Sequence, residues 1–387
     1  MLGSDGDVLP FTRLARALRD RGHAVTVHTW AQYHPWFPSA ARLVAPVLDV
    51  SVAQLHACHV EALALATPWD QIARFARTFY GLDHAPAARR AAFAAASDAA
   101  RGHDVAVCDV LDPMGQLACD ATRVPWYSWA SRPAPDPRDV DGPLAATDRA
   151  LSTAFTEATG APQQVATFRA RGPLGDLVNA SPTLVLPHPH HPEAIVTGPW
   201  WAAAATAPAP LPPALAAFLD AGPPPVLVSF GTVPDLSGRA RALLAAAART
   251  GWRAILQVLP PEPPPRWVPP TALVVRERLP FATLLPRVAA LVHHGGAGTV
   301  HEATRAGCPS LTMPHMADQY CWARAAATRG LGPPPLHHAV RDLATLDAAF
   351  DALRAPAWRE RALALGPRIA AEDGITATVA RLEATRP

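Results

Sequence analysis

The sequence predicts an α/β protein with two domains, each built around a parallel sheet covered by helices. Its 387 residues suffice for two domains of ordinary size, each with its own core. Short apolar runs alternate with stretches of helical spacing in both halves, which is typical of parallel sheets. Eight prolines between residues 199 and 225 separate the halves. We therefore expect domains at residues 1–198 and 226–387, joined by a linker at 199–225.

The composition restricts the classes of function. Half of the residues are hydrophobic and the formal net charge is +2, which indicates a globular protein and gives no support to a nucleic-acid partner. No apolar run reaches the roughly 18 residues of a membrane helix, and the start lacks a signal-peptide pattern. We therefore expect a soluble protein without stable membrane insertion. Peripheral membrane contact and the oligomeric state stay open.

The cysteines favour a reducing compartment. None of the five belongs to a CxxC pair, and an odd number in a chain of this length does not suggest a disulfide framework. We therefore expect the protein to be cytoplasmic.

The first domain is expected to begin with a helix at residues 10–21. Pro10 suits the first helical position, and Gly22 suits the position after the end. Strands are expected at residues 24–29, 104–109, 126–129 and 183–186. Residues 3–10 resemble the loop after a first strand, but only two residues precede them and a strand needs about five. We expect the central first strand to be missing because the start is shortened; the alternative is a whole chain with an ordered N-terminal loop.

The second domain begins with an apolar strand at residues 226–230 and a helix at 239–248. Seven prolines between residues 260 and 270 mark a surface loop. Residues 358–383 are expected to be helical except near Pro367 and Gly374. Further strands are expected at residues 253–259, 272–275 and 289–293.

A glycine-rich stretch at residues 292–299 carries the main functional signal. It follows an apolar run and precedes a helical pattern that ends at Gly307. A strand that leads through a glycine-rich turn into a helix directs backbone N–H groups and the positive end of the helix dipole to one point. Such a point suits a phosphate group. The alternative is that the glycines merely ease packing at a helix start.

The residues after this helix extend the pattern. A short strand and turn at residues 308–314 are followed by the pair Asp318 and Gln319. The block from Leu279 to Pro333 resembles the nucleotide-sugar motif of family 1 glycosyltransferases, in particular their bacterial sterol, glycolipid and antibiotic branch. The resemblance implies the GT-B fold, with two facing Rossmann-like domains, parallel sheets and a cleft between them. It also implies that the first domain binds the acceptor, that the second binds the nucleotide sugar, and that the last helix crosses back to the first domain.

The resemblance assigns a phosphate-binding role to the glycine-rich turn. His294 stands where the family places the histidine that contacts the donor phosphate, thirteen residues before Gly307. His293 is expected to be the buried last residue of the strand. Thr299 would also offer a hydroxyl. Backbone amides for the phosphates are expected from Gly296, Ala297, Gly298 and Thr299.

Three positions are expected to bind the sugars of the donor. Glu302 matches a carboxylate that binds ribose hydroxyls, and the alternative is a solvated helix residue. Asp318 and Gln319 match the acid–amide pair that binds the hydroxyls of the transferred sugar. Asp318 suits the N-cap of the next helix equally well.

Two further segments complete the expected donor site. Ser229, Gly231 and Thr232 resemble the loop that faces the donor phosphates after the first strand of the second domain. Arg278 and Leu279 stand where relatives hold the base, although many relatives have an aromatic residue at position 278. Arg278 could stack its guanidinium on the base or leave this contact to the main chain. The base therefore stays open between UDP-linked and dTDP-linked donors.

The expected general base is Asp7, three residues before Pro10. Many relatives carry a histidine in this loop, whereas the bacterial sterol and antibiotic branch carries an aspartate. Burial in an apolar acceptor pocket would raise the pKa of this carboxyl and make it a better base. The alternative is that Asp7 caps the helix beginning near Pro10. Asp109 and Asp112 are second candidates for the role.

No metal and no cofactor are expected beyond the nucleotide sugar, which is a co-substrate. The phosphate loop has neither a P-loop lysine nor an acidic pair beside it, and backbone amides can bind a diphosphate without Mg²⁺. The tract at residues 188–192 contains three histidines, but prolines flank them and no cluster of acidic or cysteine ligands lies nearby in the sequence. We do not expect this tract to bind a metal.

The function implied by the resemblance is that of an inverting glycosyltransferase. It would move a hexose to a hydroxyl group of a hydrophobic small molecule, such as a sterol, a lipid, or a polyketide or peptide natural product. Two alternatives stay open. One is a nucleotide-sugar 2-epimerase of the same fold, which needs no acceptor. The other is a non-catalytic, glycosyltransferase-like partner protein.

Overall fold

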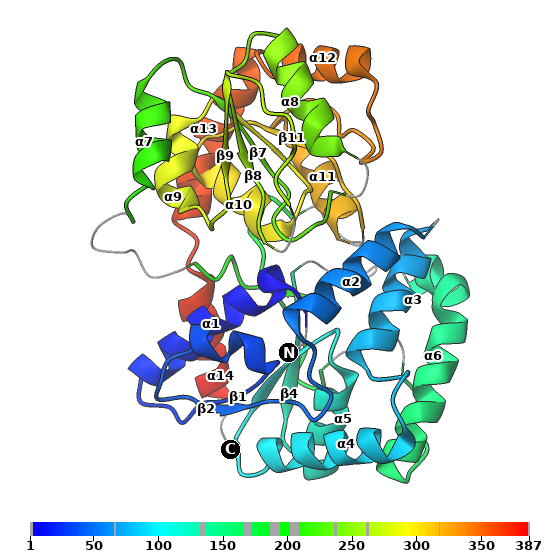
Figure 1. Cartoon of the computed structure of the whole chain (residues 1–387). Helices are drawn as coiled ribbons and strands as arrows, with labels where there is room; N and C mark the ends of the chain where they lie inside the picture. The colour runs from blue at the N-terminus through cyan, green and yellow to red at the C-terminus, as the bar shows by residue number, and fades with distance from the viewer. Residues whose placement is uncertain are drawn as a thin grey trace. The chain divides into compact units, whose positions relative to one another are not determined.

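The chain divides into two compact units in a computed structural model (Figure 1). Unit 1 comprises Met1–Pro182, Leu186–Ala202 and Asp373–Pro387, and unit 2 comprises Thr183–Val185 and Ala203–Glu372. The structure describes residues 3–65, 67–131, 137–165, 172–185, 194–201, 209–235, 238–260, 263–316 and 318–385.

The strands of unit 1 form two separate parallel sheets. Strands β1 (Thr26–His28) and β2 (Arg42–Val44) form the smaller sheet. The larger sheet has the order β3-β4-β5-β6. Its strands are β3 (Ala106–Asp109), β4 (Trp126–Ala130), β5 (Asp176–Val178) and β6 (Ile195–Val196).

Helices surround these two sheets. They are α1 (Asp5–Asp20), the 3-10 helix η1 (Ala31–Trp36), α2 (Val52–Leu63), α3 (Pro68–Phe79), α4 (Pro86–Ala100), α5 (Pro113–Thr122), α6 (Pro137–Thr159) and α14 (Gly374–Ala384).

The C-terminal helix α14 lies against α1 in unit 1, red beside blue in Figure 1. Trp200, which is 1% exposed, is central to this packing. Its ring lies 5.7 Å from the ring of Phe11, and its indole N–H donates to Thr378 of α14 at 2.9 Å. An interior aromatic ring with a satisfied N–H combines apolar burial with a directed bond. The last helix therefore shares the core of the unit in which the chain begins.

Unit 2 has one continuous five-stranded parallel sheet in the order β11-β10-β7-β8-β9. Four of its strands, β7, β8, β10 and β11, are buried at every position, as expected for strands covered by helices on both faces. The strands are β7 (Val226–Ser229), β8 (Ala254–Gln257), β9 (Ala272–Val275), β10 (Ala290–His293) and β11 (Ser310–Thr312). The expectation of parallel sheets is confirmed.

The helices of unit 2 pack in pairs, with α8 against α12 and α10 against α13. They are α7 (Pro213–Asp220), α8 (Arg239–Arg249), α9 (Phe281–Leu284), the 3-10 helix η2 (Leu285–Arg287), α10 (Ala297–Arg305), α11 (Gln319–Thr328), α12 (Leu343–Ala352) and α13 (Pro356–Ala370).

The first helix begins earlier than the sequence predicts. Helix α1 starts at Asp5, so Pro10 lies inside it and Asp7 lies in its first turn, not in a loop. The Ser4 amide and hydroxyl both donate to Asp7 Oδ2, at 2.8 and 3.0 Å. This side-chain capping stabilises a start upstream of the proline, which lacks an N–H but can follow a formed first turn. The expected helix start at Pro10 is wrong.

The strand expected at residues 183–186 is also wrong within the described residues. Thr183 lies in a turn, and its hydroxyl donates to Glu372 Oε1 at 2.8 Å. Its backbone N–H donates to the same oxygen at 3.4 Å, so this segment is bonded to a side chain and not to a neighbouring strand. Leu186 lies outside the described residues.

The proline-rich segment at 199–225 is not a plain linker, because it contains α7. Pro213 occupies the first helical position, where a missing N–H costs nothing. Leu215 and Leu219 are buried in the core of unit 2.

Helix α13 continues through Pro367, where a break was expected. The preceding Gly366 packs directly on α10, since a Cβ there would lie 2.9 Å from the Arg305 carbonyl oxygen.

Candidate functional site

The glycine-rich turn connects β10 to α10 at the carboxyl edge of the sheet in unit 2. Gly295 has φ +86°, and a Cβ there would lie 2.9 Å from the Gln319 carbonyl oxygen, so only glycine fits without strain. Gly296 is the N-cap residue of α10. The first-turn N–H groups, from Ala297, Gly298 and Thr299, have no acceptor within the helix. They form the positively polarised end at which anions bind.

His293 holds this turn by a hydrogen bond to its backbone. It is fully buried, and burial, followed by the influence of His294, lowers its pKa to about 3. Its Nδ1 accepts from the Gly295 N–H at 3.1 Å, so the neutral ring carries its proton on Nε2. That Nε2 has no hydrogen-bond partner among the described residues. The expectation that His293 is the buried last residue of the strand is confirmed.

His294 lies between two of the predicted donor-binding glycines. A Cβ on Gly231 would lie 3.6 Å from His294 Cε1, and a Cβ on Gly296 would lie 2.5 Å from His294 Nε2. The imidazole therefore uses space that a side chain at Gly296 would fill. The structure brings these three residues together although they come from the ends of two strands, β7 and β10.

The end of β7 is held by a chain of hydrogen bonds. The Ser229 hydroxyl donates to Gln257 Oε1 at 2.6 Å, and Gln257 Nε2 donates to the Glu277 carbonyl oxygen at 2.8 Å. Ser229 is only 3% exposed. Its hydroxyl thus fixes neighbouring strand ends, which is a different task from the direct donor contact predicted from the sequence.

The remaining residues of the two predicted loops differ in exposure. Gly231 has φ +58° in the turn after β7, and Thr232 beside it is exposed. Arg278 is exposed after β9, whereas Leu279 packs against the core of unit 2. The bond from Gln257 to Glu277 fixes the backbone just before Arg278. The backbone is therefore fixed just before the position predicted to hold the nucleotide base, and the Arg278 side chain at that position is exposed.

Glu302 and Gln319 have partners of their own. Glu302 forms an ion pair with Arg305, one turn further along α10, at 2.5 Å. Gln319 is 7% exposed, and its Oε1 accepts from the backbone N–H groups of His315 and Met316 at 2.9 and 3.2 Å. The Oε1 of Gln319 is thus occupied by the main chain, which leaves the NH₂ group as the donor of this side chain. Asp318 stands at the N-cap position of α11 with helical backbone angles, φ −65° and ψ −20°.

A buried cation that the sequence analysis did not single out lies beside these loops. Arg239, the first residue of α8, is 4% exposed, and its guanidinium carbon lies 3.7 Å from the centre of the Phe230 ring. The guanidinium also contacts His315 Nε2. Burial first, and then Arg239, His338 and His294, lower the pKa of His315. His315 therefore stays neutral, and its Nε2 accepts a hydrogen bond from the Arg239 guanidinium. Both residues lie at the carboxyl edge of the sheet, the one signal that could have identified them.

In unit 1, the two predicted catalytic carboxyl groups interact. Asp109 ends β3 and is 1% exposed. Burial, followed by the negative charge of Asp7, raises its pKa well above the usual value. Its Oδ1 accepts from the Leu111 N–H at 2.9 Å, and its Oδ2 has no hydrogen-bond partner in the described part of the chain. The fold thus pairs Asp7 with a carboxyl group that favours its protonated form.

Asp112 has a structural task. It is the N-cap residue of α5, and its Oδ1 accepts from the Gly115 N–H at 3.0 Å. This bond satisfies one of the first-turn donors of the helix. Its candidacy as a base is weakened accordingly.

No group of three or more histidine, cysteine or acidic side chains is arranged to hold a metal ion among the residues that the structure describes. The histidines of the tract at 188–192 lie outside those residues. A search of the described helices finds none that is long and apolar enough to cross a membrane.

Known proteins resemble this chain in both sequence and structure. Residues 262–385 match the family described as erythromycin biosynthesis protein CIII-like, C-terminal domain. The vancomycin aglycone glucosyltransferase of Amycolatopsis orientalis is 39% identical over 161 residues, which are 40% of this chain and 37% of that enzyme. A sterol 3-beta-glucosyltransferase of Arabidopsis thaliana is 31% identical over 42% of this chain and 27% of that enzyme. The chain thus spans well under half the length of these two relatives.

Other likenesses extend over the whole chain. The O-mycaminosyltylonolide 6-deoxyallosyltransferase of Streptomyces fradiae is 29% identical over 97% of this chain and 93% of that enzyme. The glycotransferase of kitacinnamycin has a TM-score of 0.73 at 21% identity, covering 100% of this chain and 97% of that one. The glycosyltransferase VinC, solved in complex with dTDP, has a TM-score of 0.70 at 20% identity, covering 100% and 98%. The chain thus has the GT-B fold, its residues 262–385 match the EryCIII-like C-terminal domain, and the proteins similar to it include antibiotic and sterol glycosyltransferases.

Proposed function

We propose that this protein is an inverting, metal-independent glycosyltransferase that moves a hexose from a nucleotide-diphosphate sugar to a hydroxyl group of a hydrophobic small molecule. One observation carries the proposal: His294 lies between Gly231 and Gly296 at the positive end of α10. Backbone amides, an imidazole and a helix end converge there, which suits a diphosphate. The names of the relatives, which act on vancomycin aglycone, sterols and O-mycaminosyltylonolide, support a hydrophobic acceptor.

The donor would bind along the carboxyl edge of the sheet in unit 2. The diphosphate would accept hydrogen bonds from the first-turn amides of α10 and from His294. The NH₂ group of Gln319 and the carboxylate of Asp318 would bind hydroxyls of the sugar, because Gln319 Oε1 already accepts from the main chain. Arg239 adds positive charge near the phosphates without facing solvent, since it is 4% exposed. These groups would take over the charge neutralisation that a divalent metal provides in other enzymes.

The transfer step would need one base and one leaving group. The acceptor oxygen attacks the anomeric carbon while its proton passes to the Asp7 carboxylate. The bond between the anomeric carbon and the phosphate oxygen breaks, and the nucleotide diphosphate departs with both electrons. The amides of α10 and His294 would stabilise the charge that develops on it. Attack from the face opposite the leaving group inverts the anomeric configuration.

Asp109 would support Asp7 as a positioning residue. Because its pKa is raised by burial and by Asp7, it favours the protonated, uncharged form. The negative charge of the pair then resides on Asp7, where a base is needed. Ser4 holds the Asp7 carboxylate by two hydrogen bonds, at 2.8 and 3.0 Å, which fixes its rotamer at the start of α1.

The base of the nucleotide and the cellular location are part of the same proposal. A dTDP-linked or UDP-linked sugar is proposed as donor, and the dTDP bound to VinC supports the first. Arg278, exposed beside a fixed backbone, is proposed to stack on the base. We place the enzyme in the cytoplasm, where the five thiols, all free in the structure, would stay reduced.

The test is a panel of UDP- and dTDP-sugars, first in calorimetry and then in a reaction with sterol, lipid and macrolide acceptors followed by mass spectrometry. A glycosylated product with inverted configuration, formed in EDTA, is the expected result. A product formed from donor alone would identify an epimerase. Donor binding without any turnover on the full acceptor panel would favour the non-catalytic partner protein. Activity that EDTA abolishes and Mg²⁺ or Mn²⁺ restores would contradict metal independence.

A further inference from the structure

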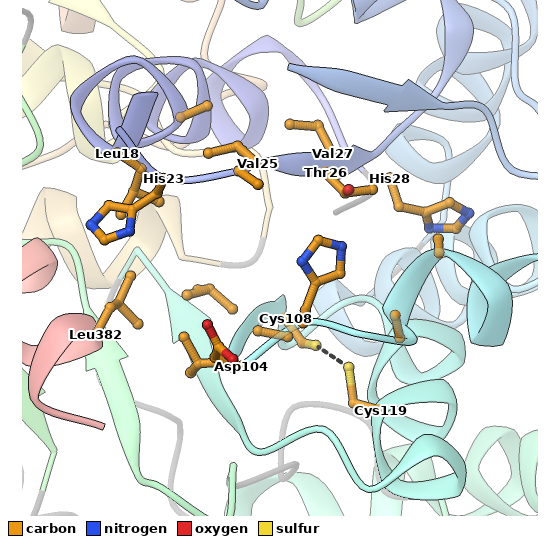
Figure 2. Close-up of a pocket in the computed structure, with 18 of the residues that line it drawn as sticks. Leu18, His23, Val25, Thr26, Val27, His28, Asp104, Cys108, Cys119 and Leu382 are labelled. Carbon is orange, nitrogen blue, oxygen red and sulfur yellow. Dashed lines mark hydrogen bonds between the residues drawn. The ribbon is translucent and has the colours of Figure 1, made fainter. Parts of the chain in front are cut away.

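A cavity of about 430 Å³ lies inside unit 1 (Figure 2). One side is lined by the consecutive residues 22–28, which include β1, and another by the consecutive residues 102–108, which include most of β3. Both strands are edges in the described part of the chain, since β1 pairs with β2 and β3 pairs with β4. Figure 2 shows the two strand segments on opposite sides of the cavity, with Thr26 and Val27 on one and Cys108 on the other.

In each edge strand, hydrogen bonds show which residues direct their backbone N–H and C=O groups toward the neighbouring strand and which direct them toward the cavity. Val25 accepts from the Arg42 N–H at 2.9 Å and the Thr29 N–H donates to the Val44 carbonyl at 3.1 Å, so odd-numbered residues are directed toward β2. Because successive residues of a parallel strand direct their polar groups to opposite sides, Ala24 and Thr26 are directed toward the cavity.

The polar groups of β3 alternate between its partner strand and the cavity in the same way. The Ala106 N–H donates to the Pro125 carbonyl at 2.9 Å, and the Val110 N–H donates to the Trp129 carbonyl at 3.0 Å. Even-numbered residues are therefore directed toward β4, and Val105 and Val107 are directed toward the cavity. The edges of two parallel sheets thus present rows of backbone donors and acceptors to one space.

The other walls of the cavity come from helices and are mostly apolar, apart from Glu383 of α14 and Asp112 at the start of α5. Phe11, Leu14, Ala15 and Leu18 of α1 line it together with Leu382 of α14. A second helix pair, α4 and α5, also lines it. Its contributions are Ala96, Ala99, Ala100, Gly115 and Cys119. A strand in such a position is covered by helices and reads as a continuous apolar run.

We propose that this cavity takes an extended polypeptide strand of about five apolar residues, which pairs in parallel with both β1 and β3 and leads into α1. Its insertion would join the two sheets of unit 1 into one. Helix α1 would then connect the inserted strand to its neighbour β1, which is the right-handed strand–helix–strand unit of parallel sheets. A small molecule could fill the volume, but only a main chain repeats N–H and C=O groups at the spacing of two strand edges.

The experiment compares three proteins: the chain as given, a form with five Val and Ile residues joined directly before Gly3, and a form with five Ser and Asp residues there. Hydrogen exchange followed by NMR reports the amides of Thr26 and Val107. We expect the apolar extension to slow exchange at both amides at least tenfold and to raise Tm by on the order of 10 °C. The polar extension should change neither, and amides of β7 in unit 2 serve as the internal control.

Two outcomes would overturn the proposal: equal exchange at Thr26 and Val107 in all three proteins, or protection by the polar extension as strong as by the apolar one. If the apolar extension does not fold, the same pentapeptide is added in trans to the chain as given, and the same two amides are followed. Lack of protection at saturating peptide then rejects the strand, whereas protection of both edges supports it. Protection by macrolide or sterol acceptors in place of the peptide would assign the cavity to a small molecule. None of these readouts depends on transferase activity, so the inference and the proposed function can fail separately.

Discussion

The two parallel sheets of this molecule differ in continuity. In unit 2, β7 lies in the middle of five strands and pairs with β8 on one side and β10 on the other. In unit 1, the strands are divided into a sheet of two and a sheet of four, and the cavity of about 430 Å³ is lined by the edges of both. A continuous sheet holds its strand ends in fixed register, and those ends carry the loops proposed to bind the donor. The proposed donor site therefore rests on the continuous sheet, whereas the proposed general base, Asp7, belongs to the unit with the divided sheets.

The sharpest test of unit 1 is Asp7→Asn. The amide keeps the size of the side chain and an oxygen that can accept from Ser4, but it cannot take the acceptor proton. Loss of a general base typically lowers kcat by about 10²–10⁴-fold. Donor affinity and Tm should stay near those of the unchanged protein, so both are measured beside the rate. A variant that retains most of its kcat would transfer the role to Asp109.

The corresponding test of unit 2 is His294→Ala. Removing one charge-assisted hydrogen bond to the diphosphate should weaken nucleotide binding by about 1.5–3 kcal/mol, or roughly 10–150-fold in Kd. Calorimetry with UDP and dTDP measures the effect. His84→Ala, which removes an exposed imidazole from unit 1, is the matched control and should bind nucleotide normally. Equal affinities in the two variants would remove His294 from the donor site.

A pair of glycine substitutions compares the units at matched backbone strain. Gly295 has φ +86° and Gly22 has φ +85°, but a Cβ meets the Gln319 carbonyl oxygen only at Gly295 and meets nothing within 4 Å at Gly22. Gly22→Ala should cost about 1 kcal/mol from the left-handed backbone alone, and Gly295→Ala about 1–3 kcal/mol in total. Denaturant unfolding measures both. Because Gln319 must shift in the second variant only, that variant alone should also bind the donor sugar more weakly; equal costs and equal binding would contradict the close approach at Gly295.

The smallest effect is expected from the pH dependence of Asp109→Asn. The pKa of Asp109 is raised in the folded protein, so the native state binds more protons than the unfolded state between the two pKa values. Stability contributed by the protonated form is therefore present below the unfolded pKa of about 4 and is lost as pH rises toward the folded pKa. The asparagine variant should lack this loss. Its free energy of unfolding should therefore increase relative to that of the parent as pH rises. Parallel curves for the two proteins would show that Asp109 titrates normally.

The sequence was most informative where one physical signal dominated. The strands at 226–229 and 290–293 are apolar up to their last residues, Ser229 and His293, because both faces are covered, and their prediction needed nothing else. Strands of only two or three residues, such as Arg42–Val44, Asp176–Val178 and Ile195–Val196, were missed. Runs this short have no periodicity to detect.

Proline misled the prediction at both ends of the chain. It was read as the start of α1 and as a break in α13, whereas capping by Ser4 and Asp7 in one case and packing on α10 in the other overrode the local preference. The candidate site shows the same division. The loop around His294 could be predicted because its residues are consecutive in the sequence. The contact between Arg239 and His315 could not, because it joins residues that are far apart in the sequence and belong to no motif.

The hydrogen-bond chain from Ser229 through Gln257 to Glu277 has a consequence for the thermodynamics of binding. It ties the ends of β7 and β8 to the segment after β9 through buried groups, at 2.6 and 2.8 Å. A nucleotide that arrives at this edge meets backbone that is already ordered. Little conformational entropy then has to be lost on association, so most of the contact enthalpy is retained as affinity. Gln257 would thereby set the rigidity of the proposed nucleotide site without any need to touch the nucleotide.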